Sequence, residues 1–139
     1  MAEAGRLLSS PLPRARETAE LLALGRPFET DPVFVEAPLP APHIPWLRAS
    51  PSFWWVLSRV TWWCGLAMGA ESRPDAEARA RTAAGRLAGA AEAGTVALCG
   101  HGWFNRMIGR VLRRQGWICV ADGGDAYWSL RRYAKRPQS

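Results

Sequence analysis

The stretch RLLSSPLPRARETAELLALG, from Arg6 to Gly25, predicts a strand followed directly by a helix. Its first four residues, RLLS, form a short apolar run of strand length. Ser10 can cap a helix, Pro11 suits a first helical turn, and Gly25 is typical of a helix end. We therefore expect a helix from Ser10 to Leu24. A strand that leads straight into a helix favours an α/β fold over an all-helical bundle.

A second unit of the same kind lies near the carboxyl end, in TVALCGHGWFNRMIGRVLRRQG, residues 95–116. TVALC is a buried strand by its apolar run, and a helix is expected from about Trp103 to Gln115, with Gly116 as its stop. His101 lies at the junction, where an α/β fold displays side chains at the carboxyl end of its sheet. Beyond it, WICVADGGDAYWSLRRYA predicts two strands around the hairpin turn signal DGGD.

The middle of the chain is less regular. Six prolines punctuate residues 27–45, where only VFVE, residues 33–36, could be extended. Four tryptophans recur between Ser52 and Met68, a segment that predicts a helix with an aromatic stripe. Core packing or a subunit contact is the favoured interpretation of that stripe, ahead of a lid over a pocket and of a membrane-surface helix. A long Ala-rich helix follows from Ser72 to Ala93.

Composition narrows the class of protein. The 139 residues suit one domain, 1–139, with a Trp-rich helical insertion at about 46–68. Hydrophobic residues make up 48% and the net charge is +6, but the arginines are scattered, so a nucleic-acid partner is not expected. Three cysteines without CxxC spacing indicate neither a disulfide framework nor a zinc site, which favours the cytoplasm. With no long apolar run, a membrane partner is not expected either.

Residues 9–19, SSPLPRARETA, closely resemble the Ser-Ser-Pro-Leu-x-Arg-Ala-x-x-Thr-Ala signature of the histidine phosphatase superfamily, the phosphoglycerate mutase-like proteins. Three further segments match that family in the same order along the chain. They are VFVEAPLP (33–40), GAESRPDAEARAR (69–81) and TVALCGHGWFNRMIGRVL (95–112). The Trp-rich segment has no counterpart in the resemblance.

The resemblance implies a three-layer α/β sandwich and phosphoryl transfer to a histidine, without a metal or organic cofactor. On this chain it implies that Arg14, His101 and Gly102 bind phosphate, with His101 stabilising the transferring group. Glu36 would protonate the leaving oxygen. Several fixed cationic donors suit the charge spread over three phosphoryl oxygens, and a nearby acid suits a leaving alkoxide. The implied partner is a phosphorylated small molecule or phosphate.

One motif that the resemblance implies is missing. The family's nucleophile lies in an Arg-His-Gly motif at the end of its first, central strand, whereas the histidines of this chain are His43 and His101, and neither follows an arginine. A domain without that central strand is expected to show altered strand pairing or to form a homodimer. A misassigned start site or a truncated gene would account for the same departure. The resemblance therefore predicts phosphate binding and does not assert turnover.

Alternatives remain open at this point. His43, in the Pro-rich loop, or His101 could replace the nucleophile, and His101 could instead merely cap the helix that follows it. A function from another class is a non-catalytic interaction or oligomerisation module, in which the Trp-rich helix makes the contact and the phosphate pocket is vestigial.

Overall fold

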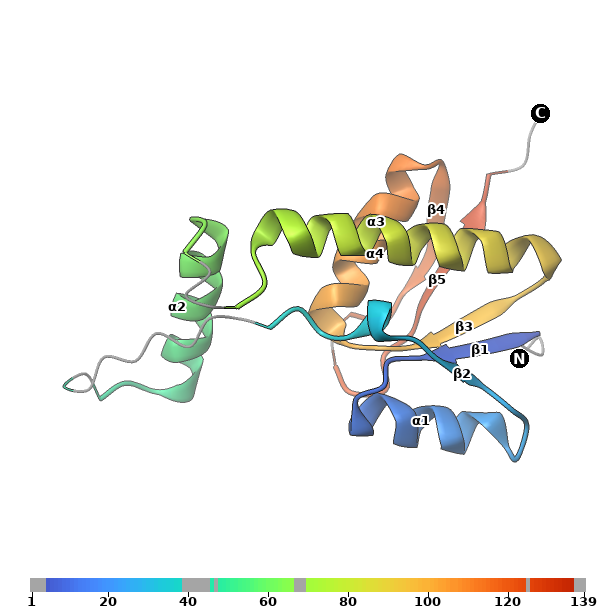
Figure 1. The fold of residues 1–139 in the computed structure, drawn as a ribbon, viewed down its shortest axis with the longest axis horizontal. Helices are drawn as coiled ribbons and strands as arrows, with labels where there is room; N and C mark the ends of the chain where they lie inside the picture. The colour runs from blue at the N-terminus through green and yellow to red at the C-terminus, as the bar shows by residue number, and fades with distance from the viewer. Residues whose placement is uncertain (1–4, 39–45, 47, 67–69, 125, 137–139) are drawn as a thin grey trace. The chain divides into compact units, whose positions relative to one another are not determined.

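Figure 1 shows the computed structural model of the chain, which describes residues 5–38, 46, 48–66, 70–124 and 126–136. The chain divides into two compact units. One comprises residues 1–36 and 79–139, and the other comprises residues 37–78. The first unit holds every strand of the described residues and is the one that carries the candidate site.

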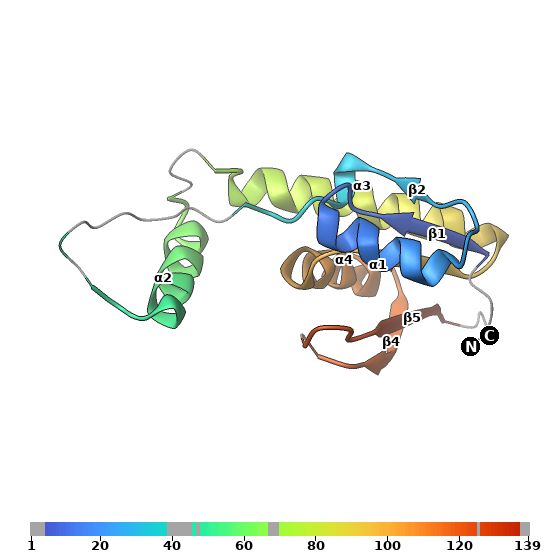
Figure 2. The same ribbon diagram turned by 90° about the horizontal axis from the view of Figure 1, so that it is seen from below.

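A small parallel sheet organises the first unit. Strands β1 (Arg6–Ser9), β2 (Glu29–Thr30) and β3 (Val96–Cys99) lie in the order β2-β1-β3, and Leu8 of β1 pairs with Glu29 on one side and Leu98 on the other. Helix α1 (Pro13–Ala23) covers one face of the sheet. The part of α3 (Arg73–Ala90) from Arg79 onward covers the opposite face (Figures 1 and 2). The mixed α/β class expected from the sequence is confirmed.

Helix α4 (Gly102–Arg114) follows β3 after a two-residue turn and connects it to an antiparallel hairpin of β4 (Trp117–Asp122) and β5 (Arg131–Lys135). One face of α4 is buried because its apolar side chains recur at helical spacing, at Phe104, Met107, Ile108 and Leu112. The hairpin packs on α4 through β4 and through Tyr133 of β5. Both elements agree with the prediction of a helix and a hairpin in this part of the sequence.

Strands β3 and β4 belong to separate sheets although α4 joins them. Cys99 O accepts a hydrogen bond from Ser10 N, at 2.9 Å, and Thr95 O accepts one from Arg6 N, at 3.2 Å. Since peptide groups alternate in direction along a strand, Val96 and Leu98 direct theirs away from β1. Within the described part of the chain no strand pairs with this outer edge of β3.

Two local predictions were wrong. Helix α1 begins at Pro13 with Leu12 as its N-cap, not at Ser10, because Ser10 is still bonded to β3 through its backbone N–H. The segment VFVE is not extended over its length. Pro32–Phe34 form a 3-10 turn instead, capped by Asp31, whose Oδ1 accepts from Val33 N at 2.9 Å.

The second unit contains α2 (Pro51–Trp63) and the first turns of α3. Ser50 Oγ caps α2 by accepting from Phe53 N, at 3.3 Å. Trp62 is buried and donates its indole N–H to Glu71 O at 2.8 Å, while the Arg73 guanidinium lies 3.9 Å from the centre of the Trp63 ring. Among the described residues, no helix has the length and the apolar character needed to cross a membrane.

The contact between α4 and the hairpin gives a prediction. A Cβ atom on Gly109 would lie 2.1 Å from Tyr133 Oη and 2.8 Å from Tyr133 Cζ. Overpacking therefore opposes the helix propensity gained by alanine, and we expect Gly109→Ala to lower the free energy of unfolding by about 1–2 kcal/mol. Urea denaturation followed by circular dichroism measures the change.

Two variants control this prediction. Gly85→Ala, in α3, places its Cβ where no atom lies within 4 Å, so it should stabilise the protein slightly. Tyr133→Phe removes the nearest atom, so Gly109→Ala should cost less in that background. Equal effects of the two glycine substitutions would show that Tyr133 does not press on Gly109.

Candidate functional site

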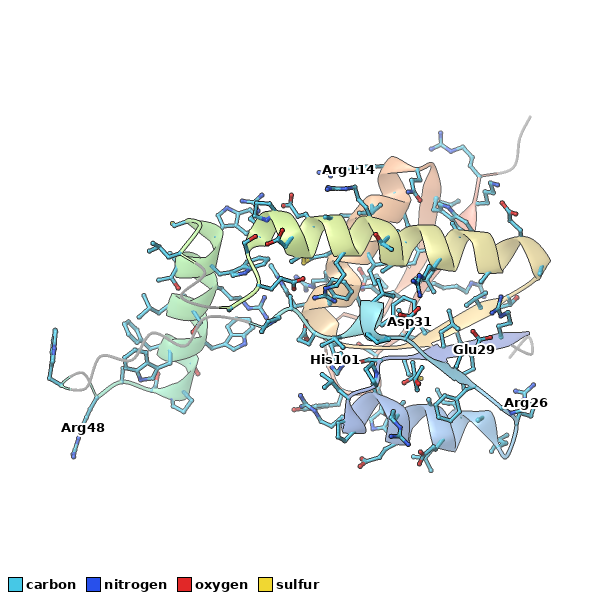
Figure 3. All side chains as sticks on the ribbon, viewed as in Figure 1. Arg26, Glu29, Asp31, Arg48, His101 and Arg114 are labelled. Atoms are coloured by element: carbon cyan, nitrogen blue, oxygen red, sulfur yellow. The ribbon has the colours of Figure 1, made fainter. Side chains whose placement is uncertain are left out.

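The candidate site lies at the carboxyl ends of β1 and β3. Parallel strands end at the same edge of a sheet, so the residues that follow them, Ser10 and His101, come together although 91 positions separate them. His101 Nε2 lies 2.9 Å from Ser10 Oγ. In Figure 3 His101 stands at this end of the sheet, while Arg26 and Glu29 lie towards the other end.

Ser10 is held by the backbone around it. It is fully buried, its N–H donates to Cys99 O at 2.9 Å, and its Oγ also accepts from Leu12 N at 3.3 Å. The neighbouring Ser9 hydroxyl donates to Ser10 O at 2.9 Å. A buried hydroxyl needs hydrogen-bond partners, and these bonds hold the Ser10 hydroxyl where it faces His101. Sequence reasoning used Ser10 as a helix cap and missed this contact.

His101 is the N-cap of α4, yet its side chain makes no capping hydrogen bond. The interpretation of His101 as a mere helix cap is therefore wrong, because the ring is engaged with Ser10 instead. The side chain is 8% exposed, and this burial is the main cause that lowers the pKa of His101. The Glu36 carboxylate opposes the shift and the Arg14 guanidinium adds to it. Burial thus favours the neutral form of the imidazole.

Glu36 lies at the amino end of α4. Its Oε1 accepts a hydrogen bond from Phe104 N at 3.0 Å, so the carboxylate faces the positive end of the helix dipole. Arg79 holds the segment before Glu36, since its Nη1 donates to Val33 O at 3.0 Å and to Val35 O at 2.6 Å. The Arg79 guanidinium also lies 4.0 Å from the centre of the Phe104 ring. Arg79 is a positioning residue that the sequence analysis missed.

Two further predicted residues occupy helix starts near His101. Arg14 is the second residue of α1 and is exposed, and its charge acts on His101. Gly102 is the exposed first residue of α4, where a backbone N–H has no helical carbonyl to bond. The structure thus brings the four predicted site residues, Arg14, Glu36, His101 and Gly102, to one end of the sheet.

Asn105 adds an unsatisfied group beside this turn. Its Oδ1 is buried and has no hydrogen-bond partner among the described residues, and a Cβ atom on Gly100 would lie 2.5 Å from it. A glycine at position 100 is therefore required for the Asn105 side chain to pack over the turn before His101. A buried carbonyl oxygen without a donor is costly, and since it only accepts hydrogen bonds it is not a contact for a phosphoryl oxygen.

The described residues do not extend the site further. His43 lies outside them. A cavity of about 330 Å³ lies between β2 and α3, but its charged lining residues are paired, Arg6 with Glu29 at 2.7 Å and Arg86 with Asp31. No group of three or more histidine, cysteine, aspartate or glutamate side chains that could hold a metal ion occurs in the part of the chain that the structure describes.

This arrangement is suited to an anion. Two helices begin beside His101, and helix starts carry free N–H groups and positive potential. Arg14 adds a permanent positive charge, and the neutral His101 gains a second one when it binds a proton. Glu36 supplies a carboxyl group at the same helix start. The site therefore offers cationic donors beside a carboxyl group.

One comparison with known proteins found a match. The sequence model of the histidine phosphatase superfamily (branch 1) matches residues 2–117, which include every residue of the candidate site. The comparisons with curated proteins and with solved structures found no match.

The lowered pKa of His101 is testable. NMR titration should give His101 a pKa below its ordinary value of 6.5, assigned by the loss of its signal in His101→Gln. Glu36→Gln should lower the pKa further and Arg14→Ala should raise it, since each substitution removes one of the two charges. A His101 pKa at or above 6.5, unaffected by either variant, would contradict the described geometry.

The same shift predicts how stability depends on pH. Because the folded state binds the proton less tightly than the unfolded chain does, His101 contributes stability above pH 6.5. That contribution is lost as the pH falls from 6.5 through the lower pKa of the folded state. Urea unfolding of the wild type and His101→Gln, compared on both sides of this range, measures the difference.

Proposed function

Because the chain belongs to the histidine phosphatase superfamily, we propose that its candidate site binds the phosphoryl group of a small phosphomonoester or free phosphate. The observation that carries the proposal is the buried Ser10–His101 contact at the ends of two parallel strands, where the Arg14 and Glu36 charges both act on the imidazole. No cofactor, metal or nucleic acid is part of the proposal.

Each residue has a distinct proposed role. Arg14 is exposed and can form two parallel hydrogen bonds to phosphoryl oxygens, while the N–H of Gly102 can donate to a third oxygen. His101 contributes a second cation once the bound anion favours its protonated form. Glu36, fixed by Phe104 N and by the Arg79 contacts to its own segment, is the residue that would protonate the leaving oxygen if a nucleophile were supplied to the site.

Hydrolysis needs a nucleophile in addition to the residues that bind phosphate. The 139 residues contain no Arg-His-Gly motif, and the proposed site contains His101, whose Nε2 lies 2.9 Å from Ser10 Oγ. If His101 attacked phosphorus, no second histidine of the described residues would stabilise the transferring group. We therefore propose that this chain binds phosphate and does not by itself hydrolyse phosphomonoesters.

The rest of the proposal concerns the whole domain. We propose a three-layer α/β sandwich in which a further strand lies along the open edge of β3, with residues 46–68 as an insertion. A second copy of the chain could supply that strand and make a homodimer. We place the protein in the cytoplasm, since Cys64, Cys99 and Cys119 are free thiols.

Phosphate affinity tests the binding proposal. Arg14→Ala and His101→Gln should each weaken phosphate binding about tenfold or more, because each removes a charge-assisted hydrogen bond worth about 1.5–3 kcal/mol. Isothermal calorimetry with inorganic phosphate measures the affinities. Arg26→Ala is the matched control, since Arg26 lies near the other end of α1, away from His101 (Figure 3). Equal affinities for all three variants would place phosphate elsewhere.

A hydrolysis assay tests the second half of the proposal. The 139-residue chain should not release phosphate from an aryl phosphate faster than His101→Ala does, between acidic and neutral pH. Hydrolysis that the substitution abolishes would show that His101 takes part in turnover, and the proposed absence of turnover would be wrong. His43→Ala would then show whether the second histidine also contributes.

A further inference from the structure

The excess of positive charge lies in one part of the chain. Residues 102–136, which form α4 and the hairpin of β4 and β5, contain eight of the 18 basic residues but two of the 12 acidic ones. Residues 1–101 contain ten basic and ten acidic residues, so they are neutral overall. The net charge of +6 therefore belongs to α4 and the hairpin.

Arginines form a row on the outer side of α4. Arg106, Arg110 and Arg113 recur at spacings of four and three residues, so they lie along one side of the helix. Arg114 follows Arg113 at the carboxyl end of α4, where it is labelled in Figure 3. These four side chains, which we call the arginine row, are all exposed. The apolar side chains of α4 are buried on the opposite side: Phe104, Met107, Ile108 and Leu112.

Carboxylates near α4 leave most of the row uncompensated. None of the ion pairs among the described residues involves Arg110, Arg113 or Arg114. Asp122, at the end of β4, already accepts a hydrogen bond from Arg131 Nε at 2.8 Å. An anion that approaches these three arginines therefore does not have to displace a carboxylate from them.

Helix electrostatics account for only part of the row. The helix dipole favours cations in the last turn, which explains Arg113 and Arg114. Arg106 and Arg110 lie before that turn, so the dipole does not explain them. Glu36 accepts a hydrogen bond at the amino end of α4, more than one turn before Arg110. A ligand for the whole row is the simpler explanation.

The row is too long for one small anion. Arg106 and Arg114 are separated by about 12 Å along the helix, at 1.5 Å per residue. Exposed Lys135 adds a charge beyond the carboxyl end, because it pairs in register with Trp117, which follows α4 closely. One phosphoryl group cannot contact cations spread over this length, whereas a polymer with repeated negative charges can.

Exposed aromatic rings lie at the other end of the row. The turn of the hairpin carries Tyr127 and Trp128, which are 88% and 73% exposed. This turn lies near the amino end of α4 (Figures 1 and 2), where the Arg106 charge acts on Asp122. Bases of a single-stranded nucleic acid stack on aromatic side chains, and cationic side chains follow its backbone.

We propose that α4 and the hairpin bind single-stranded nucleic acid. The arginine row and Lys135 contact the phosphates of the backbone, and Tyr127 and Trp128 stack on bases. A second copy of the chain would bring the same positive charges together. An acidic peptide matches the charges but offers no row of planar bases to the rings, so the two features together favour a nucleic acid.

This proposal departs from the expectation of no nucleic-acid partner. That expectation rested on the arginines being spread along the chain. The acidic residues that offset them are not spread in the same way, and the structure places the remaining arginines along one side of α4. The surface includes neither Arg14 nor His101, so this proposal and the phosphate site can fail separately.

Fluorescence anisotropy of a labelled oligothymidylate with the full 139-residue chain tests the proposal. Affinity should fall as salt rises. The double variant Arg110→Gln with Arg113→Gln should weaken binding about tenfold or more. Its slope of log affinity against log salt should be shallower by about 1.4, since each neutralised phosphate of a single strand contributes about 0.7. Both side chains are exposed, so the circular dichroism spectrum should not change.

Arg16→Gln with Arg81→Gln is the matched control, because it removes two exposed arginines outside residues 102–136. Unchanged affinity and slope in this control support the proposal. Equal losses in the two double variants would mean that net charge alone drives binding, and the proposal would be wrong. Absence of any binding by the wild type would also overturn it.

Trp128→Ala tests whether bases stack on the hairpin turn. It should weaken binding of the oligothymidylate about tenfold and leave the salt slope unchanged, because stacking is not ionic. Full affinity in Trp128→Ala, with tighter binding of duplex DNA, would assign the surface to a double strand instead. Displacement of the oligothymidylate by polyglutamate at equal charge concentration would assign it to an acidic peptide.

Discussion

The hydrogen bond between Ser10 and His101 depends on the pairing of β1 with β3, and the candidate site depends on that bond. Both side chains are buried, so each would be left with an unmet polar group if the register between Ser9 and Cys99 changed. The register between β1 and β3 thus fixes the position of the imidazole. Everything else at the site is arranged around this fixed ring, on helices that begin directly after the two strands.

Electrostatic balance at the site follows from the same geometry. Burial favours the neutral form of His101, whereas the Glu36 carboxylate favours the charged form. Glu36 can stay near the ring because Phe104 N and the helix dipole stabilise its charge, and because Arg79 ties its segment to the backbone at Val33 and Val35. An anion that arrives beside His101 would change this balance, since it would add a negative charge on the side of Arg14.

Sequence alone predicted the elements whose signal is local. RLLS, VALC and the amphipathic α4 carry their apolar runs or periodicity within their own sequence, and the motif around His101 pointed to the candidate site. The failures concern residues whose roles depend on distant partners. Ser10 is of a residue type that often caps helices, but here its backbone N–H is bonded to β3 and its hydroxyl is bonded to His101. Arg79 looked like one of many helical arginines, and only the fold shows that it binds the carbonyls of a segment more than 40 residues away.

Two surfaces of the described chain are left incomplete, and they differ in what could complete them. The outer edge of β3 presents peptide groups of Val96 and Leu98, which need hydrogen bonds at fixed spacing, so a strand is the structure that suits them. The exposed apolar side chains of α2, Phe53, Val56, Val60 and Trp63, need only removal from water, and the hydroxyls of Ser58 and Thr61 beside them are bonded within the helix. A directional requirement demands a specific partner, whereas a non-directional one can be met by any apolar surface. For this reason we assign the sheet edge to a strand.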